Sequence, residues 1–213
     1  MNPHAVLAAL QDHPQRAFWS ASDVASACGP PISEALEALA TLVQQDAIST
    51  VAADLYTNPF STYTAEALAG ALRTPSYLSL EYALHFHNVL PQLSWSLTSV
   101  TTAARHVMVV DGWPYEYESV PKAVFGGFIR TSDPATRAPL ALATPTKALL
   151  DWLYCRGIVG NWSPTRIASM LDDMNLDEIV PHSLIAVAAR YFPDPVCQQL
   201  LTLAQPVFTE SRS

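Results

Sequence analysis

The sequence predicts an α+β protein in two parts, a small N-terminal helical module with a hairpin and a larger mixed part that ends in helices. Three observations predict this class. Apolar residues recur at helical spacing between residues 32 and 43. β-branched and aromatic residues gather in short runs between residues 94 and 129, which is typical of strands. Pro145 and Pro164 each follow a Thr or Ser, and this pairing predicts the first turn of a helix.

The composition indicates a folded chain that does not span a membrane. Of the 213 residues, 50% are hydrophobic and 14% are charged, which argues against disorder. No uninterrupted apolar run in the sequence approaches the roughly 20 residues of a membrane-spanning helix. The first residues show no basic leader and no small-residue cleavage site, so we expect a cytoplasmic protein without membrane contact. Cys28, Cys155 and Cys197 form no CxxC pair, and we expect free thiols.

The first module begins with two short predicted helices. Residues 4–11 have a helical pattern that ends before Pro14. Ser20 and Asp23 have the spacing of a capping box ahead of a second helix, which Gly29 closes.

A third helix and a hairpin complete this module. The helix is expected over residues 32–45, after a turn at Pro30 and Pro31. Its predicted buried face consists of Ile32, Leu36, Leu39 and Val43. Residues 47–60 alternate enough to form a two-stranded wing. Three helices followed by a hairpin predict a winged helix-turn-helix domain over residues 1–60.

The charge of this module conflicts with DNA reading. Up to Leu72 the only basic residue is Arg16, against seven acidic residues, whereas DNA affinity comes largely from Lys and Arg at phosphates. Glu34 and Glu37 lie on the predicted exposed face of the third helix. The candidate DNA contacts are Arg16, Ser33, Thr41, Gln44 and Gln45. One alternative is a protein-binding module. The other is a DNA-binding dimer that borrows basic residues from the second part: Arg73, Arg105, Lys122, Arg130 and Arg137.

The second part, residues 61–213, is predicted to mix helices with strands and to end in helices. Helices are expected over residues 60–76, 77–90, 143–154, 163–173, 177–191 and 194–204. Strands are expected over residues 94–102, 106–110, 115–120 and 123–129. Asp111–Gly112 marks a two-residue hairpin turn, and residues 132–139 a longer turn.

Two stretches of this second part resemble a known family. Residues 75–102 read as a Ser-containing helix with a His near its end, followed by a strand that leads to a Val-Thr-Thr motif. Residues 143–154 follow the pattern Ala-Ser/Thr-Pro-Glu-Lys-Ala-Leu-Leu-Asp, with Thr146 in place of the Glu. In order and spacing the two stretches resemble the AbiEi-type antitoxins, the transcriptional-regulator half of type IV toxin–antitoxin systems. The resemblance covers the chain up to about residue 160.

The resemblance implies a non-enzymatic protein with two functions. In that family the N-terminal winged domain binds inverted repeats in its own promoter, and the C-terminal domain counteracts a toxin with a nucleotidyltransferase fold. We therefore expect an antitoxin that acts mainly by binding such a toxin or another protein, with DNA binding weakened or lost. The alternatives are a repressor that regulates its own operon and a scaffolding relative without a toxin. The residues that the family motifs mark as partner-binding candidates are Ser79, Glu81, His85, Thr101, Thr102, Arg105, Lys147 and Asp151.

Two charged pairs have the i,i+4 spacing that brings side chains together on a helix. Lys147 and Asp151 either anchor their helix to the sheet or to a partner, or form a surface pair. Glu81 and His85 are spaced to pair on one face, whereas His85 and His87 diverge on a helix and are poorly placed to share a metal.

No motif in the sequence predicts catalysis. It contains no GxSxG, P-loop, GxGxxG or HExxH motif, so we expect no catalytic residue, no cofactor and no metal. Gly126–Gly127 is interpreted as a bulge or a close approach of the backbone. The aromatic residues of the predicted strands are interpreted as core in preference to a contact patch: Trp95, Trp113, Tyr115 and Tyr117.

Overall fold

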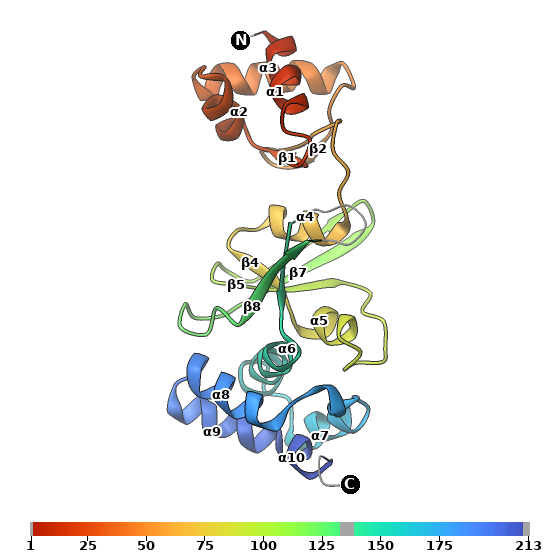
Figure 1. Ribbon diagram of the computed structural model, residues 1–213, viewed down its shortest axis with the longest axis vertical. Helices are drawn as coiled ribbons and strands as arrows, with labels where there is room; N and C mark the ends of the chain where they lie inside the picture. Colours follow the sequence, from red (N-terminus) through yellow and green to blue (C-terminus); the bar gives the residue numbers. More distant parts are fainter. Residues whose placement is uncertain (1, 133–138, 211–213) are drawn as a thin grey trace. The chain divides into compact units, whose positions relative to one another are not determined.

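The computed structural model describes residues 2–132 and 139–210, which form a mixed α+β structure (Figure 1). The described residues within Met1–Leu72 and Ser132–Leu140 form an N-terminal unit, and those within Arg73–Thr131 and Ala141–Ser213 form a C-terminal unit. The domain boundary that the sequence predicts after residue 60 stays a prediction. The predicted turn over residues 132–139, which includes Arg137, lies outside the described residues except at its two ends.

None of the described helices is long and apolar enough to cross a membrane.

The described part of the N-terminal unit combines four helices with a small antiparallel sheet. Its elements are α1 (Pro3–Gln11), β1 (Phe18–Trp19), α2 (Ala21–Cys28), α3 (Ile32–Gln44), β2 (Thr50–Ala52), β3 (Leu55–Thr57) and α4 (Ala65–Leu72). The sheet has the order β1-β3-β2. The capping box is confirmed, because Ser20 and Asp23 bond reciprocally at the start of α2, and Gly29 ends that helix with a φ of 83°. Strand β1 was not predicted, since two residues are too few to show a period.

The predicted buried face of α3 is wrong in part. The helix buries Ala35, Ala38, Leu39 and Leu42. Ile32 and Leu36 are 52% and 42% exposed. Small alanines on the inner face let the helix approach α1 and α2 closely, and the larger Ile32 and Leu36 then lie on its flank.

A buried asparagine joins the end of β3 to the end of α1 and to the loop that follows it. Asn58 directly follows β3 and is 1% exposed. Its Nδ2 donates to the carbonyl oxygens of Leu10, His13 and Arg16 at 2.9, 3.0 and 2.9 Å. Its Oδ1 accepts from the backbone N–H of Phe60 at 3.0 Å. One side chain therefore satisfies polar groups that burial would otherwise leave unpaired.

The larger sheet is mixed and has six described strands. Its order is β6-β7-β5-β4-β9-β8, from β4 (Ser76–Leu78), β5 (Leu97–Thr101), β6 (His106–Val110), β7 (Trp113–Ser119), β8 (Phe128–Ser132) and β9 (Pro139–Ala143). Strand β4 is antiparallel to β5 and parallel to β9, while β7 is parallel to β5 and antiparallel to β6. Helix α5 (Leu80–Phe86) connects β4 to β5.

Two predicted elements in this region begin at the wrong residue, and one strand was not predicted. Residues 77–90 were predicted as one helix, yet the chain enters through β4 and becomes helical only at Leu80. Residues 123–129 were predicted as a strand, but the strand starts at Phe128. Strand β9 was missed, because its short apolar run lies directly before a clear helix start.

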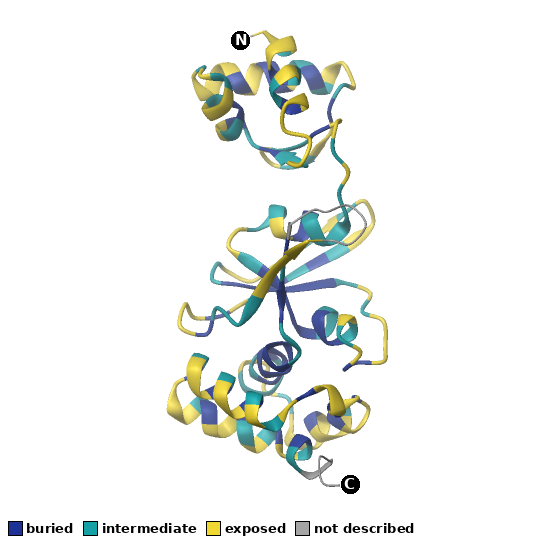
Figure 2. Ribbon diagram, viewed as in Figure 1, coloured by how far each residue is buried: buried dark blue, intermediate teal, exposed yellow. Residues whose placement is uncertain are grey.

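Helix α6 (Pro145–Trp152) begins with the predicted Thr144 cap and continues into a π-helical segment, Leu153–Val159. Thr146 through Trp152 are all buried, so α6 is dark blue around its whole circumference in Figure 2. Around it lie α7 (Pro164–Asp172), a 3₁₀ turn (Leu176–Glu178), α8 (Pro181–Tyr191), α9 (Asp194–Leu203) and α10 (Gln205–Glu210). Figure 1 shows these C-terminal helices gathered on one side of the sheet.

We expect Asn58→Asp to destabilise the N-terminal unit. The substitution replaces an NH₂ group with an oxygen that faces three carbonyl oxygens, and it buries a charge. A buried polar group without partners costs about 1–3 kcal/mol, and more when charged. Native-state hydrogen exchange of the full chain, read at the amides of α1 and β3, measures the loss. Gln45→Glu adds the same charge at an exposed position of the same unit and should change protection little. Equal effects of the two variants would contradict the assignment.

Candidate functional site

A polar cluster lies buried between the sheet and α6. We call it the lysine–aspartate cluster, and it consists of Tyr77, Ser79, Lys147 and Asp151. All four side chains are at most 1% exposed. Lys147 Nζ contacts Asp151 Oδ1 and donates to the Tyr77 hydroxyl at 3.0 Å. Tyr77 and Ser79 donate to Asp151 Oδ2 at 2.9 and 2.8 Å.

The geometry of β4 and α6 explains why these four groups meet. Tyr77 lies in β4 and Ser79 directly follows that strand, so the two are alternate residues that point to the same side of the sheet. Lys147 and Asp151 lie one turn apart on α6. Directly after Ser79, Leu80 has a φ of 57°, which turns the chain sharply from the strand into α5. The cluster therefore anchors α6 to the sheet, and its burial excludes the surface-pair alternative.

Burial governs the protonation of this cluster. It raises the pKa of Asp151, and the nearby Lys147 charge with the hydrogen bonds from Lys147, Ser79 and Tyr77 opposes that shift. Burial also raises the pKa of Tyr77, and the negative charge of Asp151 adds to the shift, so the phenol stays protonated. All four side chains are buried, so the cluster joins α6 to the sheet within the interior of the unit.

Two glycines close the cluster from the loop before β8. A Cβ on Gly126 would lie 2.6 Å from Tyr191 Cε1, and a Cβ on Gly127 would lie 2.9 Å from Lys147 Cγ. Both have a positive φ, of 152° and 74°. The Lys147 ammonium also lies 5.6 Å from the Tyr191 ring centre and 5.3 Å from that of Phe192. The interpretation of Gly126–Gly127 as a close backbone approach agrees with this geometry.

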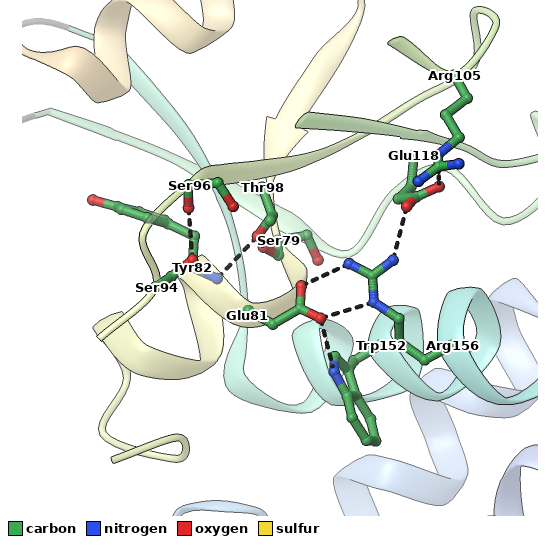
Figure 3. Close-up of polar contacts among 10 residues, drawn as sticks. All are labelled: Ser79, Glu81, Tyr82, Ser94, Ser96, Thr98, Arg105, Glu118, Trp152 and Arg156. Carbon is green, nitrogen blue, oxygen red and sulfur yellow. Dashed lines mark hydrogen bonds and ion pairs between the residues drawn. The ribbon is translucent and has the colours of Figure 1, made fainter. Parts of the chain in front are cut away.

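A second network, the arginine–glutamate chain, consists of Glu81, Arg105, Glu118, Trp152 and Arg156 (Figure 3). Arg156 binds Glu81 with two nitrogens, Nε at 2.8 Å and Nη2 at 3.0 Å. Its Nη1 donates to Glu118 at 2.8 Å. Glu118 in turn pairs with Arg105 at 3.1 Å, and Trp152 Nε1 donates to Glu81 at 3.1 Å. Figure 3 shows the guanidinium of Arg156 between the two carboxylates.

The π-helical segment supplies the central member of this chain. Arg156 lies within Leu153–Val159, where the wider turn displaces side chains from their α-helical directions. Burial by itself lowers the pKa of Arg156, but the hydrogen bonds and charges of Glu81 and Glu118 outweigh it and raise that pKa. The bidentate pair with Glu81 joins α5 to this π-helical segment with fixed geometry.

The remaining partner-binding candidates of the C-terminal unit lie at separate places. Glu81 binds Arg156 and Trp152 instead of His85, whose Nδ1 lies 3.2 Å from the Leu90 carbonyl oxygen. Thr101 is buried and donates to the Pro75 carbonyl at 2.8 Å. Thr102 is half-buried, and Arg105 is exposed. Partner binding by these residues stays a prediction.

The candidate DNA contacts lie in the N-terminal unit. Arg16 pairs with Asp23 at 2.5 Å and lies over the Trp19 ring at 4.6 Å. Ser33, Gln44 and Gln45 are exposed on α3. Thr41 is half-buried and donates to the Glu37 carbonyl at 2.8 Å within the helix. The one cation of this set is thus already engaged by a carboxylate.

Sequence reasoning missed several members of these networks. Tyr77 stands in the first family-like stretch, and its alternation with Ser79 on a buried strand is the signal that could have found it. Glu118 and Arg156 carried no such signal, because their pairing depends on the parallel β5–β7 register and on the π-helical turn. Of the four strand aromatics, Tyr115 and Tyr117 are core, whereas Trp95 and Trp113 are exposed.

No model of a known protein family matches the chain. No curated protein matches it significantly either.

Lys147→Met should destabilise the chain strongly, because it leaves the Asp151 carboxylate buried without its cation. We expect the free energy of unfolding to fall by about 3–5 kcal/mol, as for other broken buried pairs. The double variant Lys147→Met/Asp151→Leu removes both charges and should lose less than the sum of the single variants. Urea denaturation of the three proteins completes the cycle. Additive losses would mean that the two side chains do not depend on each other.

Gly127→Ala should cost more stability than Gly112→Ala. Both glycines have a similar positive φ, 74° and 80°, so the backbone strain of adding a Cβ is alike. Only at Gly127 does the new Cβ meet another group, whereas nothing lies within 4 Å at Gly112. The difference should be about 1–3 kcal/mol, the usual cost of overpacking. Thermal unfolding of both variants measures it, and equal losses would contradict the close approach.

Proposed function

We propose that this chain is an antitoxin-type protein of the AbiEi kind, which acts mainly by binding a toxin with a nucleotidyltransferase fold. The observation that carries the proposal is the contact between the two family-like stretches. Tyr77 and Ser79 belong to the first stretch, Lys147 and Asp151 to the second, and the four form one buried cluster. Ser79, Lys147 and Asp151, which the family motifs mark in the sequence, therefore meet in one buried cluster, and this contact supports the proposal.

The N-terminal unit supports the proposal of a winged helix-turn-helix. Its order of helix, strand, two helices and hairpin is the order of that fold, with α3 in the place of the recognition helix. The proposal also includes weak DNA binding. Arg16 is the only basic residue up to Leu72 and already pairs with Asp23. On the flank of α3, Ile32 and Leu36 offer apolar surface, which neutralises no phosphate.

The alternative function is a DNA-binding repressor of its own operon. The exposed polar side chains of α3 favour it, because Ser33, Gln44 and Gln45 have the hydrogen-bonding groups that read base edges. Such a repressor must draw its phosphate contacts from other basic residues, for which the described candidates are Arg73, Arg105, Lys122 and Arg130.

Co-expression separates the two functions. The full chain and a nucleotidyltransferase-fold toxin encoded beside its gene are both expressed from foreign promoters, so that autoregulation plays no part. We expect growth to be restored and the two proteins to purify together. Restored growth only when the native promoter is present would favour the repressor.

Charge reversal on α3 tests the DNA-binding prediction. At about 0.15 M ionic strength, where screening extends over about 8 Å, we expect no sequence-selective binding by the unmodified protein. Glu34→Lys/Glu37→Lys should raise affinity for any duplex without creating a sequence preference, because added charge positions the protein but reads no bases. Fluorescence anisotropy on the native upstream DNA and on a scrambled duplex measures both quantities.

The matched control is Asp177→Lys/Glu178→Lys, which changes the net charge equally in the C-terminal unit. A larger gain from the α3 variant places α3 against the DNA. Nanomolar, selective binding by the unmodified chain would restore the repressor.

A further inference from the structure

Strand β6 presents an apolar edge that no described strand covers. It lies at one end of the sheet order, and its sequence, HVMVV, contains no acidic residue and no Lys or Arg. Val107 and Val109 are 53% and 66% exposed. Exposed edge strands of this kind are templates for pairing with another strand, and proteins usually protect them with Lys, Pro or a bulge. Strand β6 contains no Lys and no Pro. It also has no bulge, because each of its residues pairs with one residue of β7.

The backbone of β6 also directs N–H and C=O groups toward the free edge of the sheet. Val109 lies opposite Pro114, which has no N–H, so this must be a non-hydrogen-bonded pair. Hydrogen-bonded and non-hydrogen-bonded pairs alternate along an antiparallel ladder, and Met108 opposite Tyr115 is therefore hydrogen-bonded. It follows that Val107 and Val109 direct their N–H and C=O groups away from β7, toward the free edge.

Strand β6 is flanked by a cation on one side and an anion on the other, so two antiparallel copies of it would place opposite charges together. Arg105 precedes the strand with a side chain that is 66% exposed, and Asp111 follows it as an exposed turn residue. These residues lie three positions to either side of Met108. We propose that β6 pairs antiparallel with β6 of a second copy of this chain, about a two-fold axis at Met108. Val107 then faces Val109 of the other copy, and Arg105 faces its Asp111.

Few other registers of the two β6 strands are possible, because the residues that direct N–H and C=O groups to the free edge must face each other. A shift of the axis to Val107 sets Arg105 against Val109, and a shift to Val109 sets Asp111 against Val107. Each shift opposes a charge to a valine. Only the axis at Met108 matches valine with valine and cation with anion, and it forms a closed two-fold contact in which the same patch serves both copies. Charge matching of this kind sets register more than strength.

This pairing is independent of the proposed function, since it rests on the edge of the sheet alone. The strand is short, so we expect a weak dimer that forms as concentration rises. Sedimentation velocity of the full chain over a concentration series measures it. Val109→Lys places a charge on the edge and should weaken dimerisation by about tenfold or more, because it removes a buried valine contact.

Ile129→Lys is the matched control, an exposed β-branched residue on the opposite edge strand β8. It should leave the dimer unchanged. A chain that stays monomeric at every concentration would overturn the proposal. A dimer that Ile129→Lys abolishes and Val109→Lys does not would overturn it as well.

Single cysteines test the register. Across a two-fold axis at Met108, the two copies of residue 108 form a non-hydrogen-bonded pair with Cα atoms about 4.5 Å apart, within reach of a disulfide. Met108→Cys should therefore cross-link into a covalent dimer under mild oxidation, faster than Val107→Cys or Val109→Cys. The unmodified chain, with its native Cys28, Cys155 and Cys197, gives the background. Fastest cross-linking at residue 107 or 109 would refute the register.

Discussion

A lysine that is completely buried governs the architecture of the C-terminal unit. The Lys147 ammonium stays in the interior because Asp151, Tyr77 and two further aromatic rings, those of Tyr191 and Phe192, surround it. A buried charge that loses its partner costs about 3–5 kcal/mol, a large fraction of a domain's net stability of about 5–15 kcal/mol, so the stability of the unit depends on these partners. That requirement fixes the position of α6 on β4, the approach of Gly126–Gly127 and the turn of the chain at Leu80.

The arginine–glutamate chain extends the same constraint toward the surface. Arg156 joins the π-helical segment after α6 to α5 through Glu81 and to β7 through Glu118. Glu118 also pairs with Arg105, which directly precedes β6. Arg105 therefore belongs both to this internal network and to the edge that we propose for self-association. A second copy at β6 would meet an arginine whose position the core of the unit already determines, which reduces the entropy lost on pairing.

Local signals in the sequence predict much of this fold, but they do not predict which distant strands and helices pair with one another. Capping residues such as Ser20, Thr144 and Ser163 locate helix starts, because a cap is a contact between near neighbours. The face of α3 was wrong because large and small apolar residues on one helix do not reveal which side meets α1 and α2. Lys147 and Asp151 were recognisable as a pair, but their link to Tyr77 spans 70 or more residues and depends on a strand that the sequence concealed.

The central claim is that the lysine–aspartate cluster makes α6 and β4 one cooperative element. Hydrogen exchange of the full chain at neutral pH tests it most directly, since amides that open only in global unfolding share the slowest rate. We predict that the amides of Ala148–Trp152 and those of β4 exchange together at that rate. Exchange of α6 that is faster than that of β4 by orders of magnitude would show that the helix opens while the strand stays folded, and it would contradict the claim.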